Sequence, residues 1–169
     1  MKIKALCFGC FLLFTLPLYA GGIVEKPISD LVINYFQYSE NIATGGALHE
    51  GAAIQLRLNG FHTVLDLRTE AEGTIAEQAE LEAQGIVYRN LPMGRTLPDS
   101  KTIETFKSIV ENPDSYPLLI HCASGNRVGT AWALYKIAEH GDVEAAIEEG
   151  RSMGMRDSRI QAIRDSLNQ

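Results

Sequence analysis

Residues 117–130 have the sequence PLLIHCASGNRVGT, in which a short apolar run is followed by a cysteine and a polar loop. An apolar run of this length with a proline at its start is typical of a buried strand in a parallel sheet. From about Val128 to His140, apolar residues recur at helical spacing. The loop therefore joins a strand to a helix, and Cys122 lies at the carboxyl end of the strand, where open α/β sheets bind ligands.

The loop after Cys122 has the features of an anion-binding cradle. Consecutive loop N–H groups and the first turn of a helix attract anions, and the same positive end stabilises a thiolate. Arg127 closes the loop, and its planar guanidinium can hold two oxygens of a phosphoryl group. A thiolate in such a cradle is suited to attack on phosphorus. A free cysteine is more often an inert core thiol, but the spacing of His121, Gly125 and Arg127 around Cys122 favours an active site.

Predicted strands alternate with predicted helices along the rest of the chain. Strands are expected at 41–46, 62–68 and 86–91, and helices at 49–59, 69–84, 101–110, 143–152 and 156–167. The helix over 69–84 is weak at Gly73, and Asp142 is placed to cap the helix that follows it. Residues 23–39 fit either a helix or a strand. The alternation predicts an α/β domain with a mostly parallel central sheet flanked by helices.

The first twenty residues have the pattern of a secretory signal peptide. A basic segment with two lysines precedes the apolar stretch 5–16, which is too short to span a bilayer comfortably, and residues 18–20 resemble a small-residue cleavage site. We expect residues 1–20 to be removed, which leaves a single domain over 21–169 with no stable membrane insertion. The expected location is outside the cytoplasm, in the periplasm of a bacterium, and an uncleaved anchor is the alternative.

The mature chain is acidic and retains one cysteine. Removal of residues 1–20 takes away two lysines, which changes the net charge from −6 to −8. An acidic chain without a Lys/Arg cluster is a poor nucleic-acid binder. Cys7 and Cys10 leave with the signal peptide, so Cys122 has no partner for an internal disulfide. The four histidines show no metal-ligand spacing, so we expect neither a metal nor a cofactor.

The segment from His121 to Arg127, followed by a helix, resembles the signature of the cysteine-dependent protein tyrosine phosphatases. Softer matches extend the resemblance to the small bacterial dual-specificity-like phosphatase domain that also occurs fused to β-lactamase-like hydrolases; they lie at 42–46, 60–68 and 88–93. The resemblance covers about residues 23–155. It implies a tyrosine-phosphatase-like fold and a metal-independent phosphatase. Such an enzyme hydrolyses a phosphorylated protein or a small phosphate ester through a phosphocysteine intermediate.

The resemblance also assigns roles to single residues. Cys122 matches the nucleophile, Arg127 matches the phosphate clamp, and His121 matches the residue that orients the loop and supports the thiolate. The backbone amides that bind the phosphate belong to Ala123, Ser124, Gly125 and Asn126. The general acid of the family lies on the loop after the strand at 86–91, where Asp99 is the only acid in 92–103. The alternative role of Asp99 is to cap the helix that follows.

Two features depart from the phosphatase pattern. Four residues separate Cys122 from Arg127, where the phosphatases have five, and a short loop also resembles the rhodanese sulfurtransferases, which carry a persulfide on the same cysteine. Val128 stands where the family places a serine or threonine that eases loss of the thiolate. A rhodanese-like sulfurtransferase and an inactive phosphate-binding module are therefore the alternatives. The two helices after the loop, and the position of Trp132 within a helix, favour the phosphatase.

Three further charged residues lie near the predicted binding edge. Asp66 and Arg68 end the strand at 62–68, where they border the site or, as we favour, form a surface or structural ion pair. Arg95 shares a loop with Asp99, where it meets an anionic substrate or stays a solvated charge.

Overall fold

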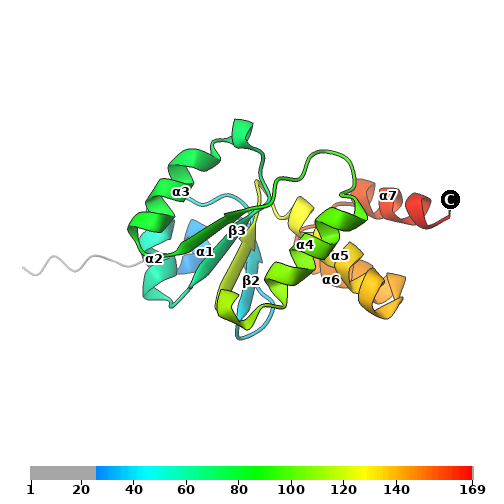
Figure 1. Ribbon diagram of the computed structural model, residues 1–169, viewed down its shortest axis with the longest axis horizontal. Helices are drawn as coiled ribbons and strands as arrows, with labels where there is room; N and C mark the ends of the chain where they lie inside the picture. Colours follow the sequence, from blue (N-terminus) through cyan, green and yellow to red (C-terminus); the bar gives the residue numbers. More distant parts are fainter. Residues whose placement is uncertain (1–25, 169) are drawn as a thin grey trace, which may run out of the picture.

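A five-stranded sheet organises the fold, and its strand order is β1-β2-β5-β3-β4 (Figure 1). The structure is a computed structural model that describes residues 26–168, so the predicted signal peptide, residues 1–20, lies outside the described residues. Strands β2, β5, β3 and β4 run parallel, and the edge strand β1 pairs antiparallel with β2. The strands are β1 (Phe36–Gln37), β2 (Ile42–Gly45), β3 (Thr63–Asp66), β4 (Val87–Asn90) and β5 (Leu118–His121). The predicted mostly parallel sheet is confirmed.

Helices cover both faces of this sheet. In Figure 1, α1, α2 and α3 lie on one side of the strands, and α4, α5, α6 and α7 lie on the other. The helices are α1 (Ile28–Leu31), α2 (Ala52–Leu58), α3 (Thr74–Ala83), α4 (Ser100–Val110), α5 (Asn126–His140), α6 (Val143–Ser152) and α7 (Asp157–Leu167), with short 3₁₀ turns η1 (Glu70–Glu72) and η2 (Pro113–Ser115). Between residues 26 and 168, no helix combines the length and the hydropathy that a membrane crossing requires.

Strand β5 lies at the centre of the sheet, and all of its residues are buried. Ile120 and Cys122 belong to the core that the sheet forms with α4 and α5, whereas Leu119 belongs to the core beneath α2 and α3. Side chains alternate between the two faces of a strand. His121 and Cys122 therefore point to opposite faces, the histidine toward α3 and the cysteine toward α5.

An aromatic cluster fixes α5 against its neighbours. The ring centroid of Trp132 lies 4.5 Å from that of Tyr38 and 6.4 Å from that of Phe106 in α4. The indole Nε1 donates a hydrogen bond of 2.7 Å to Glu149 in α6. A buried indole needs such a partner. The start of α5, which follows the cysteine loop, is thus held at a fixed position relative to the sheet.

The predicted helix over 69–84 is divided in the structure. Gly73 has a φ of +86°, which ends η1 and serves as the N-cap of α3. Glycine adopts this left-handed conformation without the steric cost of a side chain. The division leaves η1 free to turn away from the sheet, and it places Glu72 beside the carboxyl end of β3 rather than on a regular helix. By contrast, α6 has the predicted bounds, and Asp142 caps it by accepting from the N–H of Ala145.

Two glycines bring α5 and α6 into close contact. A Cβ atom on Gly129 would lie 2.2 Å from the carbonyl oxygen of Gly150, which is far inside van der Waals contact. The connection from α6 to α7 then passes directly beneath the cysteine loop. A Cβ on Gly125 would lie 2.4 Å from the carbonyl oxygen of Met153. The loop therefore rests on the backbone of the C-terminal helices without an intervening side chain.

Candidate active site

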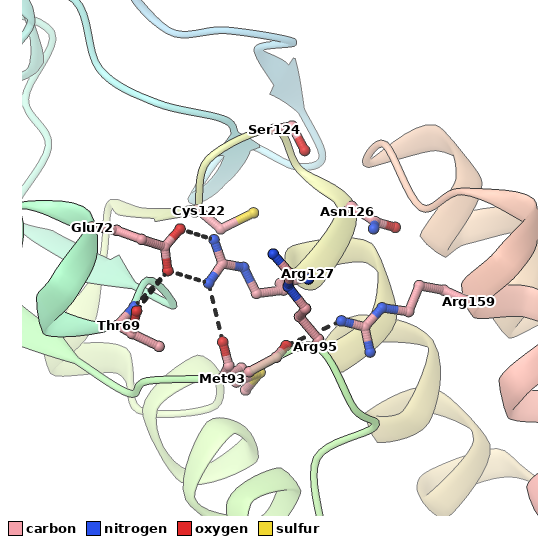
Figure 2. Close-up of a pocket in the computed structure, with 10 residues that line it drawn as sticks. Thr69, Glu72, Met93, Arg95, Cys122, Ser124, Asn126, Arg127 and Arg159 are labelled. Atoms are coloured by element: carbon pink, nitrogen blue, oxygen red, sulfur yellow. Dashed lines mark hydrogen bonds and ion pairs between the residues drawn. The ribbon is translucent and has the colours of Figure 1, made fainter.

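A cavity of about 460 Å³ opens at the carboxyl end of the parallel strands, where the sequence predicts the site. The loop between β5 and α5 forms one wall, and the segments after β3 and β4 form another (Figure 2). Helix α7 contributes one side chain. The lining residues are Thr69, Glu72, Met93, Gly94, Arg95, Cys122, Ser124, Asn126, Arg127 and Arg159. A volume of this size is typical of a small-molecule site.

Cys122 lies at the bottom of this cavity. Its N–H continues the sheet by donating to the carbonyl of Gly45, and only 1 % of the residue is exposed. The Cys122 side chain lies beside the guanidinium of Arg127 (Figure 2), close enough for the two groups to interact electrostatically. Because so little of Cys122 is exposed, only a ligand that enters the cavity can reach its sulfur. The structure thus brings together the two residues that the sequence assigns as nucleophile and phosphate clamp.

The loop from Ala123 to Asn126 is held by its carbonyl groups. The carbonyl of Ala123 accepts from the N–H of Ala47, and that of Ser124 accepts from the side chain of Asn34 at 3.2 Å. Gly125 has a φ of +84° and is the N-cap of α5. The loop therefore leads directly into the helix, so the N-terminal end of α5 faces the cavity. The positive end of a helix favours bound anions.

Arg127 is fixed by an ion pair that the sequence analysis did not predict. Its Nη1 and Nη2 donate to the two carboxylate oxygens of Glu72 at 2.7 and 2.6 Å, and Nη1 also donates to the carbonyl of Met93 at 3.0 Å (Figure 2). The N–H of Thr69 donates to the same carboxylate at 2.9 Å, within a capping box. These bonds fix the guanidinium plane through its Nη1 and Nη2 groups, and the groups that make them also line the cavity.

A count of the N–H donors of Arg127 shows which of them are still available to a ligand. A guanidinium has five N–H donors in a fixed fork. Both Nη1 hydrogens and one Nη2 hydrogen are used by Glu72 and Met93. The Nε hydrogen and the second Nη2 hydrogen lie on one edge of the plane, and that pair can donate to two oxygens of a single phosphoryl group.

The ion pair also sets the charge of both partners. The hydrogen bond from Arg127 is the main cause that lowers the pKa of Glu72 from 4.5 to about 2. The bond to Glu72, followed by the nearby Cys122 sulfur, raises the pKa of Arg127 above its ordinary value. Glu72 is therefore ionised at neutral pH, and it is the only carboxylate that lines this cavity in the part of the chain that the structure describes.

His121 lies behind the loop in a buried charged cluster. Its Nδ1 is 3.3 Å from the carbonyl of Gly46, and its Nε2 is 3.0 Å from a carboxylate oxygen of Glu77. The contact between Nε2 and Glu77 does not have the geometry of a hydrogen bond. His121 thus connects the strand before the nucleophile to α3 and does not line the cavity, so it is not placed to contact a substrate there.

Asp66 and Arg68 form the core of this charged cluster. Arg68 donates to both oxygens of Asp66, with an Nη2–Oδ2 distance of 2.8 Å, and it also pairs with Glu77. Burial alone would raise the pKa of Asp66, but the hydrogen bonds from Arg68 and the charge of His121 lower it overall. Of the two roles considered for Asp66 and Arg68, the geometry shows the structural ion pair. Since Arg68 bridges both carboxylates, it occupies the position that a cation would need.

Asp99 lies away from the cavity that contains Cys122. Its Oδ1 accepts from the N–H of Thr102 at 2.8 Å, so it is the N-cap of α4, and its side chain is exposed. This hydrogen bond lowers the pKa of Asp99. Of the two roles that the sequence leaves open, the structure shows the helix cap, and it does not place Asp99 where a leaving group would be protonated.

The residues after Arg127 supply no hydroxyl to the thiol. Val128 is fully buried in the core around α5, and the hydroxyl of Thr130 donates to the carbonyl of Asn126 at 2.7 Å. Thr130 therefore does not replace the serine or threonine that is missing at position 128.

Two arginines complete the lining. Arg159, in the first turn of α7, donates to the carbonyls of Thr96 and Gly94, and Arg95 stands beside it on the loop after β4. The sequence indicates Arg95 as a contact for an anionic substrate, but it gives no signal for Arg159, which lies in a regular polar helix with no motif around it.

The family description "DSP-PTPase phosphatase fused to NAD+ Kinase" matches residues 34–166. The chain belongs to this phosphatase family. The match includes every residue of the cavity, and it agrees with the resemblance drawn from the loop around Cys122. It also favours the phosphatase over the sulfurtransferase. No curated protein sequence matches the chain.

Solved structures of phosphatases share the fold. The core catalytic domain of the PP-IP phosphatase SIW14 from S. cerevisiae, in complex with citrate, has a TM-score of 0.65 and 21 % identity over 79 % of this chain and 85 % of that chain. P. aeruginosa TpbA in complex with pTyr has a TM-score of 0.61 and 22 % identity, covering 77 % of this chain and 82 % of that chain. Tk-PTP in the active form has a TM-score of 0.64 and 20 % identity, covering 78 % and 95 %. At these identities the likeness concerns the fold.

Proposed function

We propose that this phosphatase-family protein hydrolyses phosphate monoesters through a phosphocysteine intermediate on Cys122. The observation that carries the proposal is the meeting of the Cys122 sulfur and the free edge of Arg127 in one cavity, at the N-terminal end of α5. The proposed substrates are phosphorylated proteins, with phosphotyrosine among them, and small phosphate esters. The reaction needs no metal, because the charges that bind the phosphoryl group come from the protein.

In the first step, the Cys122 thiolate attacks phosphorus, the S–P bond forms, and the bond from phosphorus to the ester oxygen breaks. The free edge of Arg127 and the N–H groups of the loop bind the three phosphoryl oxygens as their charge changes. In the second step, water attacks the phosphocysteine and loses a proton to solvent. The S–P bond then breaks, which releases inorganic phosphate and restores the thiolate.

The leaving oxygen receives its proton from solvent in this proposal. Glu72, with a pKa of about 2, is ionised and bound to Arg127, so it has no proton to give. A positioned general acid contributes about 10²–10⁴ to such a rate. We therefore expect aryl phosphates, whose leaving groups are acidic, to react about 100-fold or more faster than alkyl phosphates.

Hydrolysis of para-nitrophenyl phosphate by the purified protein tests the proposal, with Cys122→Ser as the comparison. We expect activity that survives a metal chelator and is lost in Cys122→Ser, while the variant still binds phosphate. Full activity in Cys122→Ser would refute the phosphocysteine. Phosphate binding by the unaltered protein without any turnover would assign it as an inactive binding module. Because the short loop is the one feature that favours a sulfurtransferase, a thiosulfate–cyanide assay on the same sample is a useful control, and we expect no turnover there.

Export is a second part of the proposal, and it rests on the sequence of residues 1–20 alone. Cell fractionation together with N-terminal sequencing of the full-length product tests it. Recovery of the intact N-terminus in the cytoplasm would refute export.

A further inference from the structure

Arg95 and Arg159 have no role in the reaction described above, yet both line the cavity that contains Cys122 (Figure 2). The single carboxylate of the lining, Glu72, is bound to Arg127 by both of its oxygens. In residues 26–168 no ion pair joins Arg95 or Arg159 to an acidic side chain. Two guanidinium charges therefore face the cavity without a counter-charge.

The position of Arg159 is set by the backbone. Its Nη1 donates to the carbonyl of Thr96 at 2.7 Å, and its Nη2 donates to the carbonyl of Gly94 at 3.1 Å. These two bonds leave further N–H groups of the guanidinium without a protein acceptor. Burial and the nearby charge of Arg127 lower the pKa of Arg159, which is the sign of a cation held close to another cation. Neutral carbonyls fix such a group without cancelling its charge.

The local charge is opposite to that of the whole chain. Three arginines and one glutamate line the cavity, which gives these four side chains a net charge of +2. The complete sequence has a net charge of −6. Repulsion between like charges makes a cluster of this kind unfavourable unless an anion binds there. One phosphoryl group on Cys122 and Arg127 does not use both remaining arginines.

We propose that Arg95 and Arg159 form a second anion subsite, which selects substrates that carry a second phosphate next to the scissile one. The scissile phosphoryl group binds over Cys122 and the free edge of Arg127. The second phosphate binds between the loop after β4 and the first turn of α7. This inference rests on the proposed function, because it assigns the scissile group to Cys122. It adds a substrate class and two specificity residues.

Inorganic pyrophosphate is the smallest probe with two adjacent phosphates, and inorganic phosphate is its matched reference. Calorimetric titration of both ions into Cys122→Ser measures their affinities without turnover. We expect pyrophosphate to bind at least tenfold more tightly than phosphate at moderate salt. A preference below about twofold would overturn the second subsite.

Three substitutions in the Cys122→Ser background test whether Arg95 and Arg159 cause the preference for pyrophosphate over phosphate. We expect Arg159→Gln and Arg95→Gln each to reduce the pyrophosphate-to-phosphate affinity ratio about fivefold or more, while Arg159→Lys, which keeps the charge, preserves most of it. Arg164→Gln is the control, because Arg164 lies on the same helix but pairs with Glu144. A ratio that is unchanged in both Gln variants, or reduced equally in the control, would refute the assignment.

The outcomes separate this inference from the proposed function. If the unaltered protein hydrolyses para-nitrophenyl phosphate but Cys122→Ser binds the two ions equally, the phosphatase activity is supported and the second subsite is refuted. If the protein shows neither turnover nor phosphate binding, both the phosphatase activity and the second subsite are refuted. Circular dichroism of each variant shows whether a lost preference comes from unfolding, and the Lys variant keeps the test valid if Arg159→Gln does not fold.

Discussion

Replacement of Glu72 by glutamine tests the geometry of Arg127 most directly. The substitution keeps the shape of the side chain and one oxygen acceptor, but it removes the negative charge that holds Nη1 and Nη2. A hydrogen bond to a charged group contributes about 1.5–3 kcal/mol. If Arg127 is less well oriented and the transition state loses about 1.5 kcal/mol of stabilisation, kcat/KM for para-nitrophenyl phosphate falls roughly tenfold.

The same substitution has a consequence for stability. Conversion of the pKa change of Glu72, from 4.5 to about 2, gives about 3 kcal/mol of folding free energy. Because 34 % of the Glu72 side chain is exposed, solvent screening reduces this to about 1–2 kcal/mol. A lowered pKa means that the contribution is complete above the unfolded value of 4.5 and disappears as the pH falls toward 2. Urea unfolding at pH 7 and pH 3 measures the difference between the unaltered protein and Glu72→Gln, which we expect to shrink at the lower pH.

Glu70→Gln is the matched control, since Glu70 is an exposed acid of the same η1 turn, whereas the hydrogen bonds of Arg127 go to Leu67, Glu72 and Met93. We expect it to change kcat/KM by less than twofold. An unchanged kcat/KM in Glu72→Gln would refute the positioning role of Glu72. An increased kcat/KM, with tighter phosphate binding, would show instead that Glu72 competes with the substrate for Arg127.

Three other predictions follow from the fold and the site. Gly125→Ala places a Cβ 2.4 Å from the Met153 carbonyl at a φ of +84°, so we expect a loss of at least about 2 kcal/mol in urea unfolding and loss of phosphate binding; a stable variant would show that the loop can move. Arg68→Met leaves Asp66 buried without its partner, so the free energy of unfolding should fall by about 3–5 kcal/mol, and a loss below 1 kcal/mol would contradict this. Asp99→Ala removes a helix cap, which should lower stability by about 1 kcal/mol and reduce turnover of aryl and alkyl phosphates to the same small extent; a loss confined to the alkyl substrate would restore Asp99 as the general acid.

The regular elements of the fold follow from local patterns in the sequence. The apolar run before Cys122 became the central strand, and the break at Gly73 appears where the helix over 69–84 was expected to be weak. Segment 23–39 did not permit a prediction, because α1 has four residues and β1 has two. Elements this short are formed by tertiary contacts and carry no periodicity of their own.

The site could be predicted only where its residues are contiguous in the sequence. Cys122 and Arg127 share one loop, so their spacing alone indicates the chemistry. Glu72 is 55 positions from Arg127 in the chain, and a single sequence does not show that the two meet. The capping-box spacing from Thr69 to Glu72 was a local signal, but it predicts a turn and not an active-site partner. Arg159 lacks even that signal.

The contact between Gly125 and Met153 has a consequence for protein engineering. We expect that a loop with five residues between cysteine and arginine cannot be grafted here by itself, because the backbone at Gly125 lies so close to the carbonyl of Met153 that it leaves no room even for a Cβ atom. The backbone of Arg156 also donates to Asn126, so the graft would disturb the start of α7. Loop and C-terminal helices form one transplantable unit, and a chimera that exchanges them together should fold where a loop swap alone fails.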